Sequence, residues 1–157
     1  MPQEVAGELA NAQPTGSTRM RFFGLDIYDA KLWVGAGFSA ASYARHPLAL
    51  ELTYLRSLSG RAIAERSLKE MRRLGTIVAT QEQRWLAAME DVFPDVKNAD
   101  RITGLHQPAT GAKFWFNGQP RGTVADVEFS RLFFGIWLAE ATSEPRLRAE
   151  LLARAAP

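Results

Sequence analysis

The sequence predicts an α+β fold built on a mostly antiparallel sheet. Segments in which apolar and polar residues alternate, as they do in half-buried strands, come in two groups, within 19–54 and within 101–125. Each group is followed by two segments with helical periodicity, within 59–93 and within 126–154. Strands and helices that are segregated along the chain favour this class over a regularly alternating parallel α/β fold.

The length of 157 residues fits one compact domain. Residues 1–15 carry prolines at positions 2 and 14 and show little periodicity, so we expect them to form a loosely held, flexible lead-in. The domain is then expected to occupy residues 16–157.

The first group of strands starts at Arg19. From there to Val34 the pattern predicts two extended segments that are broken near Gly24. Residues 35–47 contain two glycines and a His-Pro pair and predict a loop. Leucines at alternate positions make residues 48–54 the clearest strand of the sequence.

Two helices are expected next. A serine at 57 or 59 can cap a helix that runs to about Leu74, and Gly75 can end it. Thr80 and Gln83 have the spacing of a capping box for a second helix, which Pro94 ends.

The remaining elements are expected to be a strand meander and two more helices. Strands are predicted at 101–106, 113–116 and 122–125, with turns between them. Asp126 can cap a helix to about Glu140 that is apolar almost all round and is therefore buried. Ser143 and Pro145 mark the start of a final helix that runs to about residue 154.

Composition excludes several classes of function. The 19 basic and 17 acidic residues are interspersed, which is unlike a nucleic-acid-binding surface. The densest basic segment, 69–73, is interpreted as a solvated helix face, with a weak role toward an anionic partner as the alternative. No apolar run approaches the roughly 20 residues of a membrane-spanning helix.

Metal, thiol and nucleotide chemistry have no signature either. The chain has no cysteine, and its two histidines, His46 and His106, have no second ligand at metal-binding spacing. No phosphate-binding loop or dinucleotide motif is present, so we expect no cofactor and no metal.

Short phrases in a fixed order carry a family resemblance. They are Gly16-Ser-Thr-Arg-Met-Arg21, Ile27-Tyr-Asp-Ala-Lys-Leu-Trp33, Phe93-Pro-Asp-Val96, Phe116-Asn-Gly118, Gly135-Ile-Trp-Leu138 and Ser143-Glu-Pro-Arg-Leu-Arg148. Together they resemble the chalcone isomerase-like family of small bacterial proteins. The resemblance implies an open-faced sandwich, in which a long curved antiparallel sheet carries helices on one face and a ligand cleft lies between the layers.

The resemblance also implies a cellular location. Members of this family often carry a secretory signal, and the polar start of this chain looks like the first residues after a removed one. We therefore expect a periplasmic or secreted protein, with a cytoplasmic one as the alternative.

Site residues follow from the same resemblance. In the isomerases and fatty-acid binders of this superfamily, an arginine early in the first strand region binds an anionic group in the cleft, and Arg19 is its match here. Tyr28 and Tyr54 are expected to assist it, although both could be core aromatics. Arg19 could instead pair with Asp26 or Asp29. The apolar part of the cleft is expected to be lined by Leu50, Leu52, Met71, Phe133 and Ile136.

Departures from the isomerase pattern decide the expected function. True chalcone isomerases add a tyrosine and an asparagine on the first helix, whereas residues 59–74 contain neither, and their buried-helix threonine falls at about Ile136. Arg66 and Glu70 are interpreted as an i, i+4 pair on the solvent side.

We therefore expect non-enzymatic binding of a small hydrophobic or amphipathic, fatty acid-like carboxylate. The alternatives are an isomerase or lyase acting on an unsaturated carbonyl compound, and a structural or interaction protein of the cell envelope with a filled cleft. The oligomeric state leaves no signature in the sequence.

Overall fold

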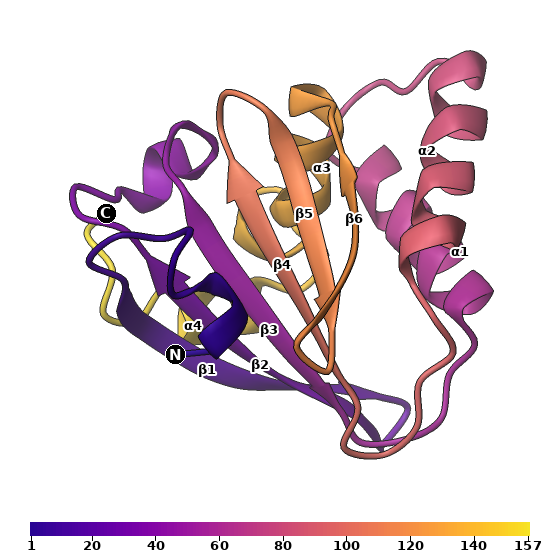
Figure 1. Cartoon of the computed structure of the whole chain (residues 1–157), viewed down its shortest axis with the longest axis horizontal. Coiled ribbons are helices and arrows are strands. Elements are labelled where there is room, and N and C mark those ends of the chain that lie inside the picture. The colour runs from indigo at the N-terminus through magenta and orange to yellow at the C-terminus, as the bar shows by residue number, and fades with distance from the viewer.

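A six-stranded antiparallel sheet is the framework of the chain in the computed structural model, which describes residues 1–157. Its strands follow one another in the order of the sequence, from β1 to β6 (Figure 1). The elements are η1 (Gln3–Val5), β1 (Gln13–Phe22), β2 (Leu25–Val34), η2 (Ala40–Arg45), β3 (Leu48–Tyr54), α1 (Gly60–Arg72), α2 (Ala79–Val92), β4 (Arg101–Gln107), β5 (Gly111–Phe116), β6 (Gln119–Val124), α3 (Val127–Leu138) and α4 (Pro145–Leu151).

The helices are gathered on one face of this sheet, as expected for an α+β open-faced sandwich (Figure 1). Alternation along each strand sends one set of side chains to that face, where Ala30, Leu32 and Leu52 join the main core. The intervening residues, such as Trp33 and Ala49, form a smaller cluster on the other face. The main core therefore lies between the sheet and the helices, where the cleft was expected.

The buried helix α3 is the centre of that core. The carboxylate of Asp126 accepts a hydrogen bond from the backbone N–H of Phe129 at 3.0 Å, which caps the first turn as predicted. The ring of Phe133 then meets those of Phe93 and Phe114 at centroid distances of 5.8 and 5.3 Å. These edge and tilted contacts fix α3 firmly against the sheet.

Helices α1 and α2 form a pair, and in the sequence they come between β3 and β4. Ser59 caps α1 as predicted, its Oγ accepting from the backbone N–H of Ala62 at 3.0 Å. The start of α2 differs from the prediction: the helix begins at Ala79, and Gln81 Oε1 accepts from the N–H of Val78 at 3.1 Å. Val78 has no side-chain acceptor, so the glutamine alone satisfies a free donor here.

The N-terminal segment also differs from the expected loose lead-in. Val5 and Leu9 are buried against the outer face of the sheet, and the carboxylate of Glu4 accepts from Arg101 Nη2 at 3.0 Å and from Thr103 Oγ1 at 2.9 Å. Strand β1 begins at Gln13, within the segment assigned to the lead-in. Burial of two apolar side chains outweighs the weak periodicity of this stretch.

Candidate functional site

An apolar cavity of about 280 Å³ lies between the sheet and the helices. Of its 20 lining residues 15 are hydrophobic, and the volume is close to the lower end of small-molecule pockets. Strands β1–β3, helices α1 and α3 and the start of α4 all contribute to it. The lining residues are Met20, Phe22, Ile27, Tyr28, Leu52, Tyr54, Leu58, Ala62, Ile63, Arg66, Ser67, Glu70, Phe93, Ile102, Phe133, Ile136, Trp137, Ser143, Glu144 and Leu147.

Five of the residues named from the sequence meet in this cavity: Tyr28, Tyr54, Leu52, Phe133 and Ile136. The other two apolar candidates lie outside it. Leu50 borders only a separate hollow of about 10 Å³, and Met71, near the end of α1, is fully buried in the main core.

Arg19 does not reach the cavity, so its expected role as the anchor is corrected. Its guanidinium pairs with Asp29 through Nε at 2.7 Å and Nη2 at 3.0 Å, and Nη1 approaches Asp26 at 3.4 Å. The Arg19 hydrogen bond lowers the pKa of the Asp29 carboxyl below its ordinary value. Arg19 therefore belongs to an ion-pair group on the outer face.

A register shift in the first hairpin is the physical reason. Pairing counted outward from the Phe22↔Leu25 turn would set Arg19 opposite Tyr28. The ladder instead shifts by one residue between Met20 and Arg21, so that Met20 pairs with Tyr28. Because side chains alternate between faces, a shift of one residue sends Met20 to the cavity and Arg19 away from it.

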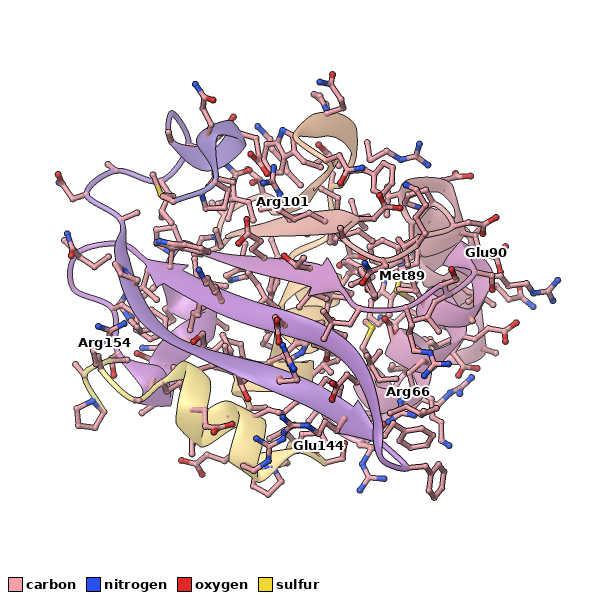
Figure 2. All side chains as sticks on the ribbon, turned by 90° about the horizontal axis from the view of Figure 1, so that it is seen from below. Arg66, Met89, Glu90, Arg101, Glu144 and Arg154 are labelled. Carbon is pink, nitrogen blue, oxygen red and sulfur yellow. The ribbon has the colours of Figure 1, made fainter.

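Arg66 on α1 supplies the cation that the cavity does contain. Its Nε lies 3.2 Å from Glu70 Oε1, as the i, i+4 spacing predicts, but the pair borders the cavity rather than facing only solvent. The Glu70 side chain is only 10% exposed and accepts a hydrogen bond from Ser143 Oγ at 2.6 Å. Figure 2 shows Arg66 and Glu144 on the side where the hairpin of β1 and β2 ends.

The helical spacing of Ile63, Ser67 and Glu70 could have found this face in the sequence. These positions are three or four residues apart and turn toward the cavity together, with Arg66 beside them. An arginine next to a buried stripe has its alkyl stem on the apolar side and its charge at the rim. The i, i+4 spacing of Arg66 and Glu70, taken without this stripe, had predicted that both side chains face solvent.

The other polar side chains of the cavity are two tyrosines, two serines and the two glutamates Glu70 and Glu144. Trp137 Nε1 donates to the hydroxyl of Tyr28 at 2.9 Å, and the rings of Tyr28 and Tyr54 meet edge to face at 5.8 Å. Tyr54 is only 3% exposed, and its hydroxyl borders the cavity without a hydrogen bond from any protein group.

Burial keeps both phenols in their neutral form. It raises the pKa of Tyr28 to about 12 and also raises the pKa of Tyr54 above its ordinary value. Each hydroxyl therefore retains its proton at neutral pH. In chemical terms, the site offers a guanidinium and two phenol O–H donors beside an apolar space, and the carboxylates of Glu70 and Glu144 also line it.

Comparison with known proteins adds the following. A family model described as chalcone isomerase-like matches residues 13–153. An uncharacterized protein of Haemophilus influenzae is 27% identical over 149 residues, which are 95% of this chain and 72% of that protein. The crystal structure of a fatty-acid binding protein of Arabidopsis thaliana superposes with a TM-score of 0.71 at 14% identity, covering 91% of this chain and 87% of that one. The structural likeness, at this identity, concerns the fold.

Proposed function

The chain belongs to the chalcone isomerase-like family, and from this premise and the cavity we propose that it binds a small amphipathic carboxylate of the fatty-acid type. The alkyl chain would lie in the apolar space against Leu52, Ile102 and Phe133. Binding rather than catalysis is the proposed role. The similarity of the fold to a plant fatty-acid binding protein supports this choice of ligand class.

The head group would be held by Arg66 and the two phenols. Burial has the largest effect on the pKa of Tyr28 and raises it, and the hydrogen bond from Trp137 lowers it. The smaller effects of Glu144, which raises this pKa, and of Arg66, which lowers it, show that both charges act on the phenol across the cavity. A guanidinium and O–H donors form charge-assisted hydrogen bonds with a carboxylate. The ion pair with Glu70 holds Arg66 at the rim, because its Nε is engaged there.

The hydroxyl of Tyr54 is the observation that carries the proposal. A polar group at the edge of the core normally has a hydrogen-bond partner in the protein or in water, since burying it without one costs free energy. Here the hydroxyl borders an apolar cavity instead. A ligand oxygen is the natural acceptor for its proton.

The protonation of the two phenols favours binding over proton-transfer chemistry. A general base works best when its pKa lies near the operating pH, whereas burial moves both phenol pKa values upward, away from neutrality. At the position where the resemblance places a threonine, the cavity is lined by the aliphatic side chain of Ile136.

A pair of arginine variants tests the proposal. Native mass spectrometry of the purified protein, followed by denaturing extraction, identifies any acyl ligand, and calorimetric titration with hexanoate, dodecanoate and hexadecanoate measures affinity. We expect Arg66→Gln to weaken dodecanoate binding about tenfold or more, the value of a hydrogen bond to a charged group. Arg19→Gln is the matched control, because the two side chains are 42% and 40% exposed.

Two results would count against the proposal. The first is that none of the three carboxylates binds and none is extracted from the purified protein. The second is that Arg19→Gln weakens binding as much as Arg66→Gln does, which would move the anchor to the other face of the sheet.

A further inference from the structure

The turn between β1 and β2 gathers exposed apolar side chains. Phe22 is 42% exposed, Phe23 89% and Leu25 48%, and these are three of the six large hydrophobic residues that the chain exposes. The rings of Phe22 and Phe23 meet edge to face at 4.4 Å. This tip, defined as residues 22–25, ends the hairpin on the side of the molecule where Arg66 lies (Figure 2). An apolar cluster of this kind on a surface marks an interaction site.

Folding does not account for the aromatic residue at the centre of the tip. Phe23 and Gly24 have φ angles of +50° and +76°, so both central positions of the turn are left-handed. Turns of this type favour Asn-Gly, and a bulky residue in the left-handed region is unfavourable. Phe23 gains almost no burial in return, since most of its surface is in solvent.

Basic side chains lie beside the tip. The guanidinium of Arg66 is 5.1 Å from the centroid of the Phe22 ring. Arg21 directly precedes the tip and is 55% exposed, and its Nε pairs with Asp26 at 3.1 Å. Two partly exposed guanidinium groups, each in an ion pair with one carboxylate, therefore lie beside the apolar tip.

The tip is also continuous with the cavity. Phe22 at the tip and Ile27 just beyond it both line the cavity, together with Arg66. An apolar surface therefore runs from the outermost point of the hairpin into the space proposed for an alkyl chain.

We propose that the tip, residues 22–25, inserts into the surface of a bilayer that contains anionic phospholipid, with Arg21 and Arg66 facing the head groups. Aromatic side chains on one side and cations on the other are the composition of interfacial membrane anchors. Three side chains on a narrow turn are too few for the roughly 800 Å² per partner of a stable protein interface. Docking would bring the mouth of the cavity to the bilayer, and this last step rests on the proposed function.

Vesicle co-sedimentation of the full chain tests the docking with no fatty acid added. We expect the protein to sediment with phosphatidylcholine–phosphatidylglycerol vesicles and less with phosphatidylcholine alone. Phe23→Asn should weaken that partition about tenfold or more, the value of burying one aromatic side chain. Val78→Asn is the matched control: it removes an apolar side chain that is 54% exposed at the start of α2, and it should leave the partition unchanged.

Loss of fold can be separated from loss of docking. Phe23→Asn creates the Asn-Gly pair that the turn favours, so its melting temperature should equal or exceed that of the wild type. Its affinity for dodecanoate in solution should also be unchanged. If the wild-type protein does not bind dodecanoate, the proposed function is wrong, but the result of the vesicle experiment is unaffected.

Three outcomes would overturn the docking. They are an absence of sedimentation with either vesicle, an undiminished partition of Phe23→Asn, and a wild-type dimer in analytical ultracentrifugation that Phe23→Asn converts to monomer while neither protein binds vesicles. The last would assign the tip to a contact between two copies of the chain.

Discussion

Replacing Tyr54 by phenylalanine separates a hydroxyl that serves a ligand from one that serves the fold. The Tyr54 hydroxyl has no hydrogen-bond partner within the protein, so its removal should change the free energy of unfolding of the ligand-free protein by less than about 0.5 kcal/mol. The same change removes a donor to the ligand carboxylate. A hydrogen bond to a charged group contributes about 1.5–3 kcal/mol, so dodecanoate should bind about 10- to 100-fold more weakly.

Tyr28→Phe is the matched comparison, because its hydroxyl accepts from Trp137 Nε1 at 2.9 Å. Trp137 is only 5% exposed, so this change leaves a buried N–H without its acceptor. We expect a cost of about 1–3 kcal/mol in the free energy of unfolding. The two variants therefore differ in stability although both remove one phenol oxygen.

Urea denaturation of the ligand-free proteins and calorimetric titration with dodecanoate measure the two quantities separately. A Tyr54→Phe protein that loses more stability than Tyr28→Phe would refute the assignment of an unpartnered hydroxyl. Unchanged dodecanoate affinity in Tyr54→Phe would show that this hydroxyl does not meet the ligand.

Three further predictions concern the fold. Burial lowers the pKa of His106, so as the pH falls the unfolded chain binds a proton at this histidine before the folded protein does. The free energy of unfolding should therefore fall as the pH drops below about 6.5, and His106→Gln should lose this pH dependence in urea titrations. Hydrogen bonds from the backbone N–H and side chain of Lys97 lower the pKa of Asp100, so the stability lost in Asp100→Asn should be full above about pH 4 and shrink in more acidic buffer. A Cβ at Gly60 would lie 2.1 Å from a backbone oxygen, so Gly60→Ala should cost about 1–3 kcal/mol in thermal melts, whereas Gly7→Ala, with nothing within 4 Å, should be neutral.

Local signals in the sequence were sufficient for most elements of the fold. Alternation along 48–54 and the caps at Ser59 and Asp126 depend on neighbours within a few residues, and the structure confirms each of them. The buried helix α3 follows from composition alone. These features are local because capping and alternation involve only the nearest turn or strand pair.

The anchor of the site depended on information that is not local. The one-residue shift in the β1–β2 ladder decides whether Arg19 or Met20 faces the cavity. No sequence motif near the turn predicts this shift. The role of Arg66 depends in turn on Ser143, 73 residues beyond Glu70 in the chain, which closes over that carboxylate. The periplasmic or secreted location stays a prediction, and cell fractionation with an antibody would test it.

The connection of the α1–α2 pair to the sheet has a consequence for how this protein can diversify. Residues 59–95 leave the meander at Leu58 and return at Val96, and these two residues exchange backbone hydrogen bonds of 3.1 and 2.9 Å. Strands β3 and β4 pair side by side without the inserted helices. Residues 59–95 could therefore be exchanged as a unit between relatives. Such an exchange would replace the side of the cavity that carries Ile63, Arg66 and Glu70, and so alter the ligand preference, while every strand pair of the sheet stays in place.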